Sequence, residues 1–517
     1  MYIRNLILLF LFLSLAGYGQ RETGLPDSTG LAAIRNEALG NSKAMSLLTA
    51  LCDGYGPRLT WSQGFRDAAD WVKTTLKGFG IEQVTYETWE PKGRDWSLMD
   101  FRASMLEPYY LPLVAYPKPY TPRTQGTIRT QVELLEFNPN TNLDEYKGVF
   151  KGKIVFLLPA QNLPLSVRPP VQRYPDSTLA QMASYKLPDS LAGAEEKAKE
   201  AANEKQTLEY FTKIKEAIAF CAREGALLVA EPGYKAYGTT QVWAAVSNEK
   251  MNDYFDFFTA GSRPLADIAV PQITLSVENY NSIVRTLKQN KPVLLEVSID
   301  IREKQAKEGF SIIAEIPGSD LKDEVVMLGA HLDSYPSSQG ATDNASGVVA
   351  CMEALRILKQ LGLQPRRTIR IGIWGGEEMG LFGSRAYVAA HFGPDSPEKL
   401  QVYFNMDYGV GRFRGIYAMG NTRAAGIFDR WMGWIGDPKF RTVTLQSSGN
   451  SDHVSFDKAG LPGFQFIQYQ LDYFRIYHTN MDTWDRVPET DFRQNIFLMT
   501  AFAWFAANRE GGFPRKK

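Results

Sequence analysis

The sequence predicts an α/β protein in which a mostly parallel, mixed sheet is covered by helices on both faces and a β-rich domain is inserted. Two observations support this prediction. From residue 311 onward, apolar runs of strand length alternate with helical segments, as in parallel sheets whose strands are joined by helices. Earlier in the chain, four prolines crowd into residues 112–122, a density that neither a helix interior nor a central strand tolerates. We expect a second unit to begin there.

The first residues have the organisation of a secretory signal peptide. Arg4 precedes an apolar run from Leu6 to Ala16, and small residues follow it. That run is shorter than the ~20 residues needed to span a bilayer. We therefore expect a signal peptide over residues 1–19, a secreted or periplasmic protein, and no membrane span.

Residues 20–110 are expected to form the N-terminal part of the main α/β domain. Apolar side chains recur at helical intervals over 43–51 and 64–79, and residues 81–90 alternate as a strand does. The glycines and the proline of 54–58 predict a loop between the two helices.

Residues 111–301 are expected to form the inserted domain. They contain strand-like and helical segments at 127–137, 153–158, 217–221, 226–230 and 271–301. A polar stretch over 161–209, rich in Ala, Lys and Glu, has no role that the sequence identifies.

Residues 302–517 carry the alternating pattern. Strands are predicted over 325–329, 368–374 and 402–406, and helices over 346–361 and 384–391. Parallel sheets bind their ligands beyond the carboxyl ends of the strands. The residues that follow each apolar run are therefore the candidates for a functional site.

Composition excludes some classes of function. Lys plus Arg equal Asp plus Glu at 57 each, so no excess charge favours binding to nucleic acid or to an anionic membrane. The three cysteines, Cys52, Cys221 and Cys351, form no C-x-x-C pair and no disulfide framework. We expect them to be buried or unreactive thiols.

Carboxylates and one imidazole follow the predicted strands of residues 302–517. In chain order they are His331, Asp333, Asp343, Glu377, Glu378 and Asp407. Carboxylates that share one crevice repel one another strongly unless cations lie between them. Histidine and carboxylates without cysteine favour zinc or a similar divalent ion.

The four histidines have different surroundings. His331 lies two residues before Asp333, whose carboxylate is placed to accept the second ring N–H and to fix the tautomer. His478 is a loop residue for which metal binding and a structural role are equally consistent. His391 and His453 adjoin predicted helices and are interpreted as structural or supporting residues.

Glu377 and Glu378 follow Gly375–Gly376 at the end of a buried run. One carboxylate can bind a metal while its neighbour stays free over the same site. General-base catalysis requires such a free carboxylate, because a metal lowers the pKa of its bound water toward about 7 and the carboxylate collects the proton. The pair indicates metal-assisted hydrolysis.

Five ordered motifs resemble those of the two-zinc exopeptidases, a family that includes secreted bacterial aminopeptidases, aminopeptidase Y and plasma glutamate carboxypeptidase. The motifs are Gly329–Ser334, Gly340–Gly347, Trp374–Glu378 with Gly380–Ser384, Asn405–Asp407 and Tyr477–Thr479. Residues 111–301 resemble a protease-associated domain, with Phe150–Val155 as its recognisable strand. The resemblance implies the zinc-exopeptidase, phosphorylase/hydrolase-like fold for the remainder of the chain.

The resemblance also implies a set of metal ligands. Asp343 would bridge two zinc ions, one held also by His331 and Asp407, the other by Glu378 and His478.

The same family implies the roles of two further carboxylates: Glu377 would be the general base, and Asp333 would orient His331. It often has a cis peptide after the bridging aspartate, here Asp343-Asn344. The expected function is a secreted zinc exopeptidase, first of all an aminopeptidase acting on peptides. A dipeptidase or carboxypeptidase and a non-catalytic binding protein are the alternatives, and the sequence leaves open whether the chain forms a homodimer.

Overall fold

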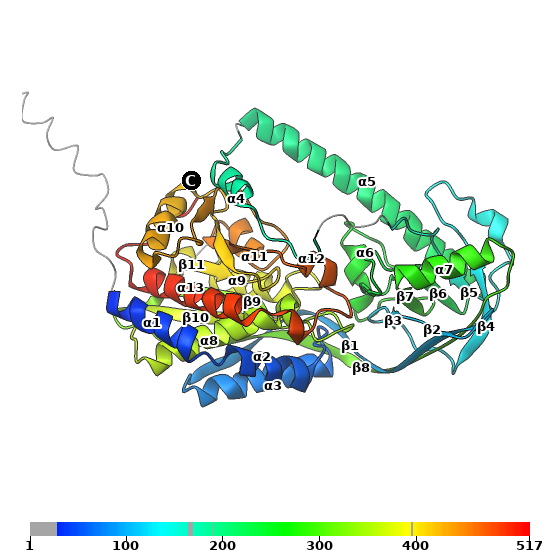
Figure 1. Ribbon diagram of the computed structural model, residues 1–517, viewed down its shortest axis with the longest axis horizontal. Coiled ribbons are helices and arrows are strands. Elements are labelled where there is room, and N and C mark those ends of the chain that lie inside the picture. Colours follow the sequence, from blue (N-terminus) through cyan, green and yellow to red (C-terminus); the bar gives the residue numbers. More distant parts are fainter. Residues whose placement is uncertain (1–27, 164–168, 189, 394–395, 517) are drawn as a thin grey trace, which may run out of the picture.

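The computed structural model describes residues 28–163, 169–188, 190–393 and 396–516 (Figure 1). The expected signal peptide, residues 1–19, lies outside the described residues. None of the helices in the described part of the chain is long and apolar enough to cross a membrane.

The strands form one mixed sheet that extends through two lobes of the molecule. Their order is β13-β12-β14-β11-β9-β10-β8 in the larger lobe and β4-β5-β6-β7-β3 in the smaller lobe, which we define as residues 111–293. The strands are β1 (Gln83–Glu107), β2 (Leu111–Pro112), β3 (Ala115–Pro117), β4 (Ile128–Leu134), β5 (Ile154–Phe156), β6 (Leu228–Pro232), β7 (Gln272–Leu275), β8 (Leu294–Ile316), β9 (Leu321–His331), β10 (Arg367–Trp374), β11 (Leu400–Asn405), β12 (Phe413–Tyr417), β13 (Thr442–Thr444) and β14 (Gly463–Gln468).

Helices surround this sheet (Figure 1). They are α1 (Ser28–Gly40), α2 (Ala44–Tyr55), α3 (Gln63–Gly78), α4 (Asp176–Ala183), α5 (Ser190–Arg223), α6 (Asp256–Thr259), α7 (Val277–Leu287), α8 (Ser346–Gln360), α9 (Phe382–His391), α10 (Thr422–Ile435), α11 (His453–Lys458), α12 (Tyr473–Ile476) and α13 (Glu489–Asn508).

The core strands of the larger lobe are buried on both faces. Along β9, Val326, Leu328 and Ala330 pack in a cluster with α1, α8 and α13, whereas Val325 and Met327 pack with α9 and α11 on the other face. This alternation follows from the two-residue period of a strand. Strands β10, β9, β11 and β14 are mutually parallel, while β8 and β12 join them antiparallel. The predicted mixed α/β sheet covered by helices on both faces is confirmed.

Two long antiparallel strands, β1 and β8, connect the lobes. The expected domain boundary at residue 301 falls within β8, which continues without interruption to Ile316. The expected strand over 81–90 likewise continues as β1 to Glu107.

The polar stretch 161–209 contributes α4 and the first part of α5. Figure 1 shows α5 crossing from the smaller lobe toward α4, which lies against the larger lobe. Leu179 and Met182 of α4 pack against Ile467 of β14, and Gln172 forms an isolated β-bridge with Leu471. From residue 195 to 206 the side chains of α5 are exposed, whereas its C-terminal part packs in the core of the smaller lobe.

Candidate metal centre

Three parallel neighbouring strands bring most of the site residues to one edge of the sheet. His331 ends β9, Glu377 and Glu378 follow β10, and Asp407 follows β11. In the register of β9 and β10, His331 lies opposite Trp374, so the carboxyl ends of these strands coincide. Two further residues come from outside the sheet: Asp343 lies in the turn Ala341–Ala345 before α8, and His478 follows α12.

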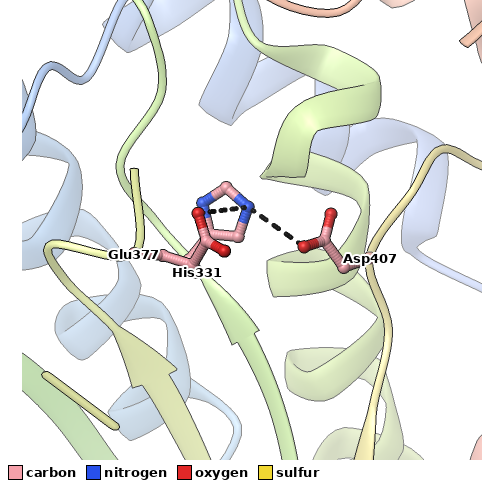
Figure 2. A group of neighbouring side chains, drawn as sticks. All are labelled: His331, Glu377 and Asp407. Carbon is pink, nitrogen blue, oxygen red and sulfur yellow. Dashed lines mark ion pairs between the residues drawn. The ribbon is translucent and has the colours of Figure 1, made fainter. Parts of the chain in front are cut away.

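The first half of the site surrounds Nε2 of His331. That nitrogen lies 3.2 Å from Oδ1 of Asp343 and 3.7 Å from Oδ2 of Asp407. Oε2 of Glu377 lies 4.0 Å from the same nitrogen (Figure 2). His331, Asp343 and Asp407 are buried.

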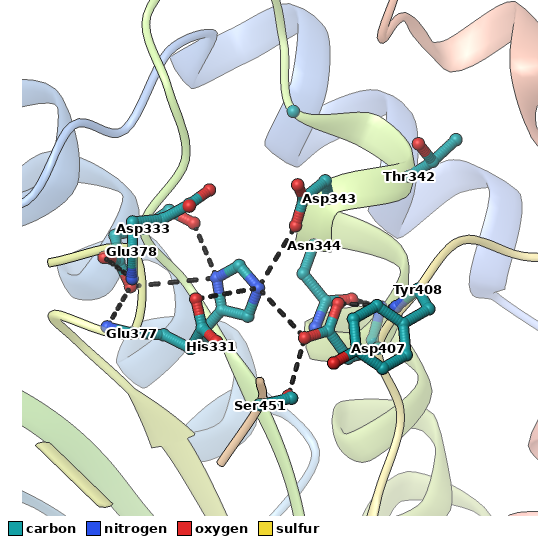
Figure 3. Close-up of polar contacts among 12 residues, drawn as sticks. His331, Asp333, Thr342, Asp343, Asn344, Glu377, Glu378, Asp407, Tyr408 and Ser451 are labelled. Atoms are coloured by element: carbon teal, nitrogen blue, oxygen red, sulfur yellow. Dashed lines mark hydrogen bonds and ion pairs between the residues drawn. The ribbon is translucent and has the colours of Figure 1, made fainter. Parts of the chain in front are cut away.

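The second half surrounds Nε2 of His478. It lies 3.2 Å from Oδ2 of Asp343 and 2.9 Å from Oε2 of Glu378. Asp343 therefore presents one carboxylate oxygen to each histidine, and it stands between the two halves of the site. Figure 3 shows its side chain pointing toward the ring of His331. The structure thus brings all five predicted metal ligands together.

These residues fit a pair of zinc ions. With zinc bonds of about 2.0–2.2 Å in a tetrahedral arrangement, two ligand atoms lie roughly 3.3 Å apart. The distances from the two histidine Nε2 atoms to the carboxylates of Asp343, Glu378 and Asp407, 2.9–3.7 Å, bracket that value. Nε2 of His331 and Oε1 of Glu378 are buried without a hydrogen-bond partner. Buried polar atoms without partners are costly, and both atoms can act as ligands of a metal ion.

The charges of the protein alone leave the site unbalanced. Burial raises the pKa of Glu378 to about 7 and that of Glu377 well above its ordinary value. Burial by itself would lower the pKa of His331, but the carboxylates of Glu377 and Asp407 outweigh it and raise that pKa well above its usual value. A divalent cation among these groups would supply the positive charge that protons otherwise provide.

Asp333 supports the site through contacts that differ from the expected one. Nδ1 of His331 donates to the main-chain oxygen of Asp333 at 2.9 Å, whereas its carboxylate lies 3.8 Å away. The expectation that the carboxylate accepts this N–H was wrong, because the carboxylate is occupied elsewhere. It accepts the hydroxyl of Thr60 at 2.5 Å and the backbone N–H groups of Glu377 and Glu378 at 3.3 Å each. Asp333 therefore links the strand of His331 to the loop of both glutamates.

Asp482 holds the loop that carries Asp343. Its Oδ1 accepts the backbone N–H and the hydroxyl of Thr342, both at 2.7 Å, and its Oδ2 accepts the backbone N–H of Asp343 at 3.1 Å. The peptide bond Asp343-Asn344 is cis, as the family resemblance implied. Asp407 is held in turn by the hydroxyl of Ser451, at 2.6 Å, and by the backbone N–H of Tyr408, at 2.6 Å (Figure 3).

Arg58 is a supporting residue that the sequence did not reveal. Its buried guanidinium donates to the main-chain oxygens of Gly56, Leu332, Gln339 and Gly340 at 2.6–2.9 Å. It thereby ties the loop after His331 to the loop before Asp343. The only sequence signal was the Gly- and Pro-containing segment 54–58, which predicted a loop and no contact.

The other two histidines lie outside the site, and two tyrosines lie near His478. Nε2 of His391 pairs with Glu87 at 2.6 Å, and Nε2 of His453 contacts the main-chain oxygen of Ser448 at 3.0 Å. Neither belongs to the group around Asp343. Tyr473 and Tyr477 stack at 5.3 Å, and the Tyr477 ring lies 4.9 Å from that of His478.

Comparison with known proteins finds a family for the part of the chain that carries the candidate site. Residues 311–503 match the family described as "Peptidase family M28". Carboxypeptidase Q of Bos taurus is 26% identical over 246 residues, which is 48% of this chain and 52% of that protein. The chain thus spans about half the length of the curated relatives that it matches.

Two solved structures share the fold over nearly the whole chain. A peptidase M28 precursor from Shewanella amazonensis SB2B has a TM-score of 0.69 at 22% identity, covering 94% of this chain and 98% of that one. BSAP, a zinc aminopeptidase from Bacillus subtilis, has a TM-score of 0.57 at 19% identity, covering 91% of this chain and 95% of that one. At these identities the likeness establishes the fold.

Proposed function

We propose, given that residues 311–503 belong to peptidase family M28, that this protein is a zinc-dependent exopeptidase that removes N-terminal residues from peptides. The observation that carries the proposal is the position of Asp343, whose two carboxylate oxygens each lie 3.2 Å from the Nε2 of a different histidine. One of the structures with the same fold is described as a zinc aminopeptidase.

We assign the metal ligands as two overlapping sets that share Asp343. His331 and Asp407 complete one set, and Glu378 and His478 complete the other. Two zinc ions held there would polarise the scissile carbonyl and lower the pKa of a bound water toward about 7.

Glu377 is assigned as the general base. Its carboxylate lies beside the first set, 4.0 Å from Nε2 of His331. The backbone N–H of Glu377 is held by the carboxylate of Asp333, which fixes the loop that carries the base. Glu377 would take the proton of the attacking water and pass it to the leaving amine. Asp333 is a positioning residue in this scheme.

A dipeptidase or carboxypeptidase is the second candidate. It is favoured by the match to carboxypeptidase Q over 246 residues. A non-catalytic binding protein is disfavoured, since the five proposed ligands and the candidate base lie close together.

We further propose that residues 1–19 are a cleaved signal peptide that directs the protein to the periplasm or the medium, from the charge and apolar pattern of its first residues. Residues 20–110 and 302–517 would form the peptidase domain, and residues 111–301 the protease-associated domain.

The test of the function is the Glu377→Ala variant. We expect the wild-type protein to bind about two zinc ions and to cleave a peptide with a free amine but not its acetylated counterpart. The variant should keep the zinc and lose roughly 10²- to 10⁴-fold in kcat. Undiminished turnover by the variant would refute the role of Glu377, and cleavage of the acetylated peptide would favour the second candidate.

A further inference from the structure

The smaller lobe contributes a wall to the metal centre. The loop 233–248 follows β6 and lies against the segment that carries His478. The backbone N–H of Val242 donates to the main-chain oxygen of His478 at 3.0 Å, and that of Thr240 donates to Oδ1 of Asn480 at 2.9 Å. The Trp243 ring lies 4.5 Å from the His478 ring. Residues of this loop are therefore placed to meet a substrate bound at the second half of the site.

Lys235 of this loop has a cationic group without a carboxylate partner among the described residues. Its Nζ donates to the main-chain oxygen of Tyr477 at 2.9 Å and lies 3.4 Å from the centroid of the Tyr477 ring. Tyr477 immediately precedes the metal ligand His478. An ammonium has three N–H donors, and one is used by this carbonyl. The cation thus lies beside the residue that precedes His478, and this carbonyl takes one of its three donors.

Lys118 of the same lobe shows the usual solution for a buried ammonium, which is an ion pair. Lys118 is buried and pairs directly with Glu231 at 2.5 Å. Lys235 is half-buried and has no such partner in the part of the chain that the structure describes, and burial lowers its pKa to about 7. The carboxylates that act on it electrostatically are Asp343 and Asp482.

Neither of those two carboxylates is free to neutralise Lys235. Asp343 is shared between the two sets of metal ligands, and Asp482 accepts three hydrogen bonds from Thr342 and Asp343. With its carboxylate engaged by cations, Asp343 contributes little negative charge to the surroundings of Lys235. A further anion would then be favoured at the ammonium, and a substrate carboxylate is the anion that a peptide brings.

We propose that Lys235 binds the terminal carboxylate of a short peptide substrate and so makes the protein selective for di- and tripeptides with a free carboxyl end. This proposal rests on the proposed exopeptidase function. In a dipeptide, the carboxylate lies only about one residue, ~3.8 Å, beyond the scissile carbonyl, and Lys235 contacts the residue next to His478. Aromatic packing of Tyr477 holds the partner carbonyl of Lys235 in place.

The experiment compares a dipeptide with its carboxyl-terminal amide in the full-length zinc-loaded protein. Leu-Leu and Leu-Leu-amide would be assayed with the wild type, Lys235→Met and Lys235→Arg. A charge-assisted contact predicts a kcat/KM roughly 10- to 100-fold higher for the acid than for the amide in the wild type. The ratio should fall to about 1 in Lys235→Met and be partly restored in Lys235→Arg.

Lys215→Met is the matched control, because Lys215 in the same lobe also donates to a main-chain oxygen, that of Glu249 at 2.8 Å. It should keep the acid-to-amide ratio of the wild type. An acid-to-amide ratio near 1 in the wild type, or an equal loss for both substrates in Lys235→Met, would overturn the proposal.

Measuring the binding of the two peptides tests the carboxylate site independently of the exopeptidase function. Calorimetric titration of the same acid and amide into zinc-loaded Glu377→Gln, with and without Lys235→Met, measures recognition without turnover. A preference for the acid that depends on Lys235 supports the carboxylate site even where the wild type cleaves neither peptide. Equal affinities for acid and amide overturn the carboxylate site while leaving any measured cleavage in place.

Discussion

Asp482→Asn should weaken zinc binding although Asp482 is not a ligand. The carboxylate accepts the N–H and hydroxyl of Thr342 through Oδ1 and the N–H of Asp343 through Oδ2, at 2.7, 2.7 and 3.1 Å. In the variant, one oxygen can still accept from Thr342, but an NH₂ group would face the N–H of Asp343. One charge-assisted hydrogen bond is lost, at about 1.5–3 kcal/mol, and Asp343, the proposed bridging ligand, must shift.

The loss of the Asp482 charge acts in the same direction. Removing a buried negative charge beside Asp343 makes the site less favourable for cations. Residues that orient metal ligands typically change metal affinity by about 10- to 100-fold, and we expect a loss in this range. The assay is isothermal titration of zinc into metal-free protein, with urea denaturation of the same samples as a measure of stability.

Asp437→Asn is the matched control. Asp437 also accepts one backbone N–H, from Lys439 at 2.9 Å, together with the side chains of Arg412 and Gln494 at 2.7 and 3.3 Å. It should lose stability and keep the zinc affinity of the wild type. A zinc affinity of Asp482→Asn within twofold of that of Asp437→Asn would refute the reasoning.

Three further predictions concern residues that do not bind metal. Arg58→Met removes four hydrogen bonds that Arg58 donates to main-chain oxygens. At about 1 kcal/mol for each bond, the free energy of unfolding measured in urea should fall by about 4 kcal/mol. A decrease below about 1 kcal/mol would contradict the role of Arg58. Burial lowers the pKa of His453 from 6.5 to about 4, so its ring stays neutral in the folded protein while the unfolded chain takes up a proton. The wild type should therefore lose about 3 kcal/mol of stability relative to His453→Gln as the pH falls from 6.5 to 4, at 1.36 kcal/mol per pH unit. Parallel curves of stability against pH for the two proteins would argue against a neutral, buried His453. The three cysteines are free and buried, and burial raises the pKa of Cys52 and of Cys221 to about 12. A thiol reagent such as Ellman's reagent should therefore label them only after denaturation. Rapid labelling of the native protein would show that they are accessible.

The sequence was most informative where a local pattern determines the structure. The apolar runs of β9, β10 and β11 are buried on both faces, which is why they read as continuous apolar segments. Because these strands are parallel neighbours, His331, Glu377 and Asp407 had to lie at the same edge of the sheet. The positions of these residues follow from strand ends alone.

Contacts between distant segments were not predictable in the same way. Arg58 donates only to main-chain oxygens, and every residue has one, so no side-chain pattern identifies its partners. Asp333 was expected to hold His331 through its carboxylate, but the Thr60 hydroxyl and two backbone N–H groups occupy that carboxylate. The helix α13 has almost no polar face over residues 492–507, because it is surrounded by other elements, and amphipathic periodicity does not detect such a helix.

Anomalous diffraction at the zinc edge from crystals of the zinc-loaded protein tests the central claim most directly. We predict two peaks, one beside His331 and Asp407 and the other beside Glu378 and His478, with the carboxylate of Asp343 between them. An anomalous map without a peak at these residues, or with its peaks elsewhere on the molecule, would contradict the assignment of a two-metal centre.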